Sequence, residues 1–317
     1  MGAFGGGNFL RTLGLRAGRI PRLGDDRGMS SSSFPTLLGV DFTSAPSRRK
    51  PITVARGERA GAAIRLAGVQ AVETFDAFEA LLAPGGLPSP WVGGFDLPFG
   101  LPRELVETLG WPQDWPSLIR HYASLERAAI RDRFAAFCDA RPAGGKFAHR
   151  ATDRPAGSSP SMKWVNPPVA WMLHAGAPRL LAAGVHLPGL HAGDLGRVAL
   201  EAYPGLLARE ILGSRSYKSD DTARQTPERL IARKDLVDAL EQGRTRLGLR
   251  LRLSHAQRDD LVADASGDRL DAVLCLLQAA WACGQPGWGL PEAVDPVEGW
   301  IATAVAEAAS TLAGSPV

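Results

Sequence analysis

The sequence predicts an α/β fold, and the order of its strand-like and helix-like segments is the basis of that prediction. Residues 37–74 contain three apolar segments separated by short turns, which indicates three consecutive antiparallel strands. An amphipathic helix is expected at 76–83, and a fourth, apolar strand at 90–100. These segments have the order β-β-β-α-β. Asp41 ends the first strand, and Asp96 ends the fourth.

The rest of the chain alternates helical and irregular sequence with one more strand. Residues 103–140 have helical periodicity, and the 28 residues at 141–168 follow without a helix or strand pattern. A connection of that length inside a compact chain is usually functional or disordered, and His149 and Trp164 favour a functional one. A fifth strand is predicted at 197–205, and further helices at 169–184, 226–243 and 266–284.

The composition is typical of a soluble globular protein, with 45% hydrophobic and 22% charged residues in 317. No apolar run approaches the roughly 18 residues that a membrane span needs. The three cysteines form no CxxC pair and leave one unpaired in any disulfide scheme, which indicates a reducing compartment. We therefore expect a cytoplasmic protein without membrane association.

The net charge of +3 lies in residues 1–34, which hold five arginines and two aspartates. The other residues carry equal numbers of basic and acidic groups, so the pI is no argument for nucleic-acid binding. We expect 1–34 to be a disordered leader. If translation instead begins at Met29, most of this segment is not part of the native protein. A transit-like targeting segment is a further alternative. A single domain is expected at 35–305, with an insertion at about 103–190 and a tail at 306–317.

Five acids lie where the predicted strands and the last helix end or begin: Asp41, Asp96, Glu201, Asp268 and Asp271. Desolvating a carboxylate without a partner costs several kcal/mol or forces its protonation. A hard divalent cation such as Mg²⁺ or Mn²⁺ would relieve that cost for several carboxylates at once. The combination of these acids therefore predicts a metal site.

Each acid also has a purely structural interpretation. Asp41 is suited to cap a turn, Asp96 to orient a proline turn, and Glu201 to pair with an arginine, while Asp268 suits the first turn of a helix. Other chemistries have weaker support, because the histidines lack HExxH spacing and Phe147 follows Lys146 where a phosphate loop requires Ser or Thr.

The segments "GVDFTSAP", "GGFDLPFGLP", "EAYPG", "YKSD" and "LDAVLC" resemble a bacterial family called domain of unknown function 429, over about residues 37–301. That family is placed among the ribonuclease H-like proteins as predicted nucleases, and "DRLD" is similar to the closing D-x-x-D of RuvC-type resolvases. The resemblance implies a ribonuclease H-like sheet in which two parallel strands follow the three antiparallel ones.

By this resemblance, Asp41, Asp96, Glu201 and Asp271 are the acids of the site, and Glu201 is either a metal ligand or a residue that orients one. Asp268 is an additional ligand, and Lys218 is a recurring lysine. The implied activity is a nuclease or other phosphodiester hydrolase that requires Mg²⁺ or Mn²⁺. Two ions about 4 Å apart would be bridged by Asp41, and Lys218 would neutralise charge on the phosphorus centre.

Nucleic acid is the partner that such a function implies. Residues 209–252 hold 11 basic and 7 acidic side chains, which together with 48–50 and the loop at 141–168 form a candidate phosphate track. A solvent-facing helix with internal salt bridges is the alternative for 209–252, and Trp164 either stacks on a base or anchors its own loop.

Two other functions stay open. One is a non-catalytic binding or scaffold protein that has retained the fold. The other is an actin-like nucleotide phosphotransferase, which Thr43 disfavours because it stands where a phosphate turn needs glycine.

Overall fold

The structure is a computed structural model that describes residues 1–2, 35–142 and 144–305. The described residues from 35 onward belong to one compact unit. The leader predicted at 1–34 and the tail predicted at 306–317 fall almost entirely outside the described residues. In these ranges no helix is both long and apolar enough to cross a membrane.

Within the described residues, seven strands form one mixed sheet in the order β5-β6-β4-β1-β2-β3-β7. β1 (Thr36–Asp41), β2 (Ile52–Ala60) and β3 (Ala63–Val72) pair antiparallel in succession. β4 (Trp91–Asp96) lies parallel to β1, and β6 (Asp194–Glu201) lies parallel to β4. The short strands β5 (Val185–His186) and β7 (Arg250–Arg252) pair parallel with β6 and β3 at the two edges.

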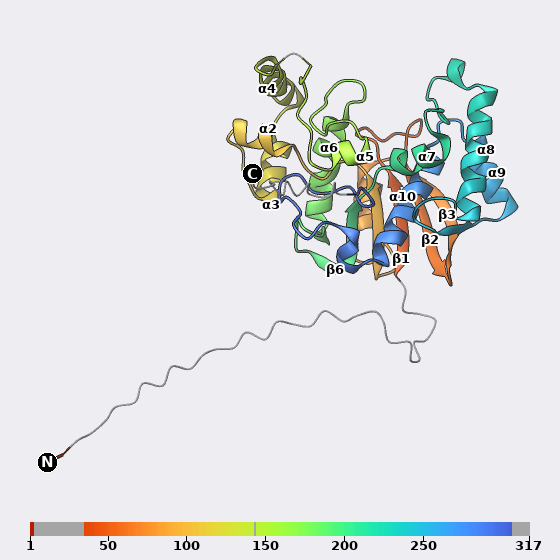
Figure 1. Cartoon of the computed structure of the whole chain (residues 1–317), viewed down its shortest axis with the longest axis horizontal. Helices are drawn as coiled ribbons and strands as arrows, with labels where there is room; N and C mark the ends of the chain where they lie inside the picture. The colour runs from red at the N-terminus through yellow and green to blue at the C-terminus, as the bar shows by residue number, and fades with distance from the viewer. Residues whose placement is uncertain (3–34, 143, 306–317) are drawn as a thin grey trace, which may run out of the picture. The chain divides into compact units, whose positions relative to one another are not determined.

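Helices surround this sheet (Figure 1). In the described ranges they are α1 (Phe75–Leu82), α2 (Arg103–Thr108), α3 (Trp115–Ser124), α4 (Arg127–Asp139), α5 (Asp153–Ala156), α6 (Val169–Ala182), α7 (Pro204–Leu212), α8 (Pro227–Gln242), α9 (His255–Ala263) and α10 (Asp268–Cys283), with 3-10 turns η1 (Thr222–Arg224) and η2 (Pro286–Gly289). The predicted α/β fold with a mixed sheet is confirmed.

The alternation of side chains along β1 separates two cores, because successive residues of a strand face opposite sides of the sheet. Leu38 and Val40 pack with side chains of α1, α3 and α6. Leu37 packs on the other side with α7, α8 and α10. Odd-numbered positions of β1 therefore face α10, and this face includes Asp41.

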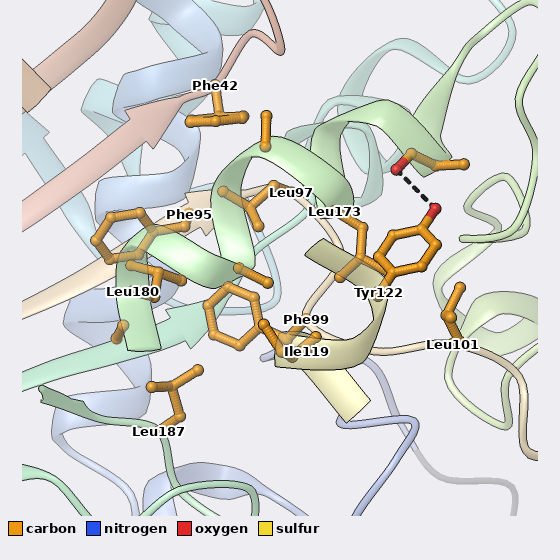
Figure 2. Close-up of a cluster of buried hydrophobic side chains, with 14 of the residues drawn as sticks. Phe42, Phe95, Leu97, Phe99, Leu101, Ile119, Tyr122, Leu173, Leu180 and Leu187 are labelled. Atoms are coloured by element: carbon orange, nitrogen blue, oxygen red, sulfur yellow. Dashed lines mark hydrogen bonds between the residues drawn. The ribbon is translucent and has the colours of Figure 1, made fainter. Parts of the chain in front are cut away.

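The first core lies between the sheet and the segment that connects β4 to β6. Phe95 and Leu97 meet Leu173 and Leu180 of α6, as Figure 2 shows. Tyr122 of α3 is also fully buried there, and its hydroxyl donates a hydrogen bond of 3.2 Å to the carbonyl of Ala170. A buried phenol needs such a partner because an unpaired polar group is costly in an apolar core.

Five helices and strands of the described residues were not predicted: β5, β7, α5, α7 and α9. The two strands have two and three residues, too few for a visible alternation of apolar and polar side chains. The fifth strand, predicted at 197–205, in fact begins at Asp194 and ends at Glu201. Pro204 then opens α7, since proline at the first position of a helix loses no hydrogen bond.

The long connection at 141–168 contains one short helix, α5, and no strand among its described residues. Trp164 is partly buried, and its ring lies 5.4 Å from that of Phe147 and 6.3 Å from that of Phe134. These contacts correspond to the anchoring role that was one of the two interpretations of Trp164.

Candidate functional site

Asp41 and Asp96 lie side by side at the carboxyl ends of two neighbouring parallel strands. They are register partners across the β1–β4 pair, so their side chains leave the same face of the sheet. The sheet face is the one that α10 covers, because Leu37 of β1 and Val92 of β4 pack with α10 side chains. A residue on the sheet-facing side of the first turns of α10 can therefore lie near both carboxylates.

Two glycines let α10 approach the sheet closely enough for this. Gly39 and Gly94 are also register partners, each two residues before one of the aspartates and on the same face. A Cβ atom at Gly39 would overlap the carbonyl oxygen of Ala272, and one at Gly94 would overlap the carbonyl oxygen of Cys275. Helix α10 thus rests directly on the strand backbones, where any larger residue would displace it.

Asp271, in the first turn of α10, completes a group of three carboxylates. One carboxylate oxygen each of Asp41, Asp96 and Asp271 lies within 4.8 Å of the other two. Asp271 is fully buried, and Asp41 is 9% exposed. Three oxygen ligands at this spacing suit a hard divalent cation.

The pKa values of two of these groups are raised. Burial is the largest cause of the raised pKa of Asp41, and repulsion by Asp271 and Asp96 adds to it. Burial, followed by repulsion from Asp271, raises the pKa of Asp96 from its ordinary value of 3.8 to about 7. The negative charge of the cluster is therefore incompletely compensated by the protein itself.

Asp271 has two hydrogen-bond donors on the segment before η1. The hydroxyl of buried Tyr217 donates to Oδ1, and Nζ of Lys218 donates to Oδ2. The Lys218 side chain is 42% exposed, so its ammonium reaches both the cluster and solvent. Attraction to Asp271 and Asp41 outweighs burial and raises the pKa of Lys218, which keeps the side chain charged.

Asp268 lies one helical turn before Asp271 and has a different partner. Its two carboxylate oxygens accept hydrogen bonds of 2.9 and 3.0 Å from Lys50, which also donates to Asp220 at 2.8 Å. Asp268 is not a member of the three-carboxylate group, although its charge contributes to the raised pKa of Asp41.

Glu201 departs from the ligand role expected for it, because it faces the other side of the sheet. Its register partner on β4 is Phe95, which points into the first core, whereas Asp96 points toward α10. The Glu201 carboxylate accepts hydrogen bonds of 2.6 and 2.8 Å from Arg150 and one of 2.9 Å from the Phe99 amide. The pairing with an arginine, which was the structural interpretation of this acid, is the one observed.

Arg150 is the partner that the sequence did not single out. It is 2% exposed and also binds Asp153, so three charged groups are buried together. Attraction to Asp153 and Glu201 outweighs burial and raises the pKa of Arg150. The pairing links residues of a long loop to β6, and no local spacing signals it.

The predicted basic track at 209–252 contains several charges held in ion pairs. Asp235 and Asp238 of α8 bind Arg215 and Arg258, and Arg246 binds Glu210. Arg233 is buried and donates to the carbonyl of Tyr217. These contacts correspond to the salt-bridged helix that was the alternative to a phosphate track.

The fold and the site together define an α/β protein with a buried group of three carboxylates at the carboxyl ends of two parallel strands. In comparisons with known proteins, no family model, no curated protein and no solved structure matches the chain.

Proposed function

We propose that this protein is a divalent-metal-dependent phosphodiester hydrolase, a nuclease with a ribonuclease H-like fold. The observation that carries the proposal is the convergence of Asp41, Asp96 and Asp271, whose carboxylate oxygens lie within 4.8 Å of one another. The three residues come from the first strand, the fourth strand and the last helix, which are the places that the family resemblance implies.

The strand arrangement supports the same proposal. The segment β3-β2-β1-β4-β6 of the sheet has three antiparallel strands followed by two strands parallel to β1. This arrangement supports the ribonuclease H-like sheet that the resemblance implies. A fold hosts many functions, so the site carries more weight than the topology.

The donor set fits Mg²⁺ or Mn²⁺. All three groups are carboxylates, which these hard cations prefer, whereas zinc sites generally contain histidine or cysteine. Lys218 is the cation that lowers the pKa of both Asp41 and Asp96, yet both values stay raised. One divalent cation would supply the charge that the cluster lacks.

When bound, such a cation would lower the pKa of a water molecule and polarise a phosphate oxygen. Side chains of the protein would hold the cation and stabilise the charge on the substrate. Asp41, Asp96 and Asp271 would hold the cation, and Tyr217 would orient Asp271 by its hydrogen bond. Lys218, half exposed beside the cluster, would donate to a phosphate oxygen and stabilise the negative charge that develops there.

Calorimetric titration with Mn²⁺ tests the metal site, and cleavage of labelled single-stranded, duplex, hybrid and branched substrates tests the activity. We expect wild-type protein to bind Mn²⁺ and to cleave at least one substrate, and Asp41→Asn to lose both. Asp235→Asn, in an exposed ion pair with Arg215, is the matched control and should behave as wild type. Absence of Mn²⁺ binding by the wild type would refute the proposal, as would unchanged cleavage by Asp41→Asn.

A further inference from the structure

A groove lies beside the acidic cluster and extends along the sheet toward β3. Its cavity volume is about 480 Å³, and its walls come from the start of β2, the end of β3, the segment around Asp220 and the loop before α10. We refer to it as the lateral groove. Arg49 and Lys50 belong to the candidate phosphate track at 48–50, but no sequence pattern predicted the groove itself, because its residues are scattered along the chain.

The sheet register connects the lateral groove to the cluster. Asp41 pairs with Thr53 across β1 and β2, and Thr53 pairs with Ala71 across β2 and β3. Thr53 and Ala71 line the groove, so its floor extends one and two strands away from Asp41, or about 5 and 10 Å. Asp268 lines the groove as well, one turn before Asp271, so the groove lies beside the cluster, although none of the three cluster aspartates lines it.

The lining carries no net charge. Arg49, Lys50 and Arg269 are offset by Asp220, Asp264 and Asp268. Lys50 is held between Asp220 and Asp268, whereas Arg49 forms no ion pair with any residue in the described part of the chain. A long polyanionic duplex is held by many unpaired cations, which this groove does not offer. The groove could, however, bind a single phosphate through Arg49.

The size and the polar groups of the groove indicate the same ligand. A volume of about 480 Å³ falls in the range of small-molecule sites, whereas specific duplex interfaces bury about 1,000 to 2,500 Å² of protein surface. Thr53, Gln70 and Gln225 add hydroxyl and amide groups of the kind that read base and sugar edges. The groove therefore suits one nucleotide of an extended strand.

We infer that the lateral groove binds one nucleotide of a single-stranded polynucleotide, next to the phosphate that lies at the acidic cluster. This inference rests on the proposed function and narrows its substrate class. In a single strand, one nucleotide can lie on the groove floor formed by Thr53 and Ala71 while the adjacent phosphate lies at Asp41. A base-paired strand is held against its complement and cannot enter.

The test measures binding in the Asp41→Asn background with EDTA, so that it depends neither on metal nor on cleavage. The probes are fluorescein-labelled single-stranded decathymidylate and a labelled blunt duplex of the same length, followed by fluorescence anisotropy. The exposed Ala71 is changed to tryptophan to fill the groove floor away from the cluster. The control is Ala62→Trp, an exposed position at the opposite end of the same hairpin.

We expect Ala71→Trp to weaken decathymidylate binding by about tenfold or more and Ala62→Trp to leave it unchanged, and we expect the duplex to bind at least about tenfold more weakly than the single strand. Equal binding by the two tryptophan variants would overturn the inference, as would equal binding of the duplex or no binding of decathymidylate. Calorimetry with Mn²⁺ on Ala71→Trp without the Asp41 change separates the two proposals, because metal binding should persist when the groove is blocked.

Discussion

Gly39 of β1 lies directly against the main chain of Ala272 in α10, with no room for a side chain between them. This contact sets the distance between the last helix and the sheet, and with it the distance between Asp271 and the two strand aspartates.

We therefore predict that Gly39→Ala destabilises the protein by about 1 to 3 kcal/mol, the usual cost of overpacking, and weakens Mn²⁺ binding as well. Urea denaturation and calorimetry measure the two effects. Gly68→Ala is the matched control, because a Cβ atom there meets nothing within 4 Å. A Gly39→Ala variant as stable as Gly68→Ala would contradict the close approach.

Replacing Arg150 with alanine should lower the free energy of unfolding by about 3 to 5 kcal/mol, because Glu201 and Asp153 would stay buried without their cation. Glu201→Gln should also destabilise the protein but leave the affinity for Mn²⁺ unchanged, since Glu201 faces away from the cluster. Loss of Mn²⁺ binding in Glu201→Gln would restore the ligand role that the sequence suggested.

Asp96 should make a contribution to the stability of the metal-free protein that falls as the pH rises from about 4 to about 7. Asp96 ionises near 3.8 in the unfolded chain but near 7 in the folded one, so the folded state is favoured while Asp96 is protonated and loses that advantage as the pH rises through 7. Thermal unfolding in EDTA between about pH 4 and pH 7 measures this pH dependence of the stability. Asp96→Asn should flatten the profile, whereas Asp235→Asn should not; an unchanged slope in Asp96→Asn would be evidence against the raised pKa.

Tyr217→Phe removes one of the two donors to Asp271 while keeping the buried ring. Because such supporting hydrogen bonds tune a metal ligand, we expect the variant to bind Mn²⁺ about 10- to 100-fold more weakly. Loss of a hydrogen bond to a buried carboxylate should also lower the free energy of unfolding by about 1 to 3 kcal/mol. Calorimetry supplies the affinity and urea denaturation the stability. Phe147→Leu, which alters a ring packed against Trp164, is the control and should not affect metal affinity.

The fold class and the first four strands could be predicted because apolar segments and turns mark them locally. Asp41 and Asp96 could be assigned to one site because both end predicted strands. Asp271 could be added to that site because it lies in the first turn of a predicted helix. The sequence could not place Glu201 on the face of the sheet opposite the cluster, because a strand end gives no information on which face the last side chain takes, and a shift of one residue exchanges the faces. Tyr217, Arg150 and the lateral groove depend on contacts between distant segments, which no spacing reveals.

The order in which the three aspartates occur along the chain has a consequence for the protein's synthesis. Asp41 and Asp96 leave the ribosome early, whereas Asp271 belongs to the last long helix and must pack onto Gly39 and Gly94 before the cluster exists. A nascent or truncated chain that lacks α10 therefore has no assembled cluster. Under the proposed function, hydrolysis of nucleic acid would begin only after synthesis and folding of the domain are nearly complete, and an unfinished nuclease would be harmless to the RNA that encodes it.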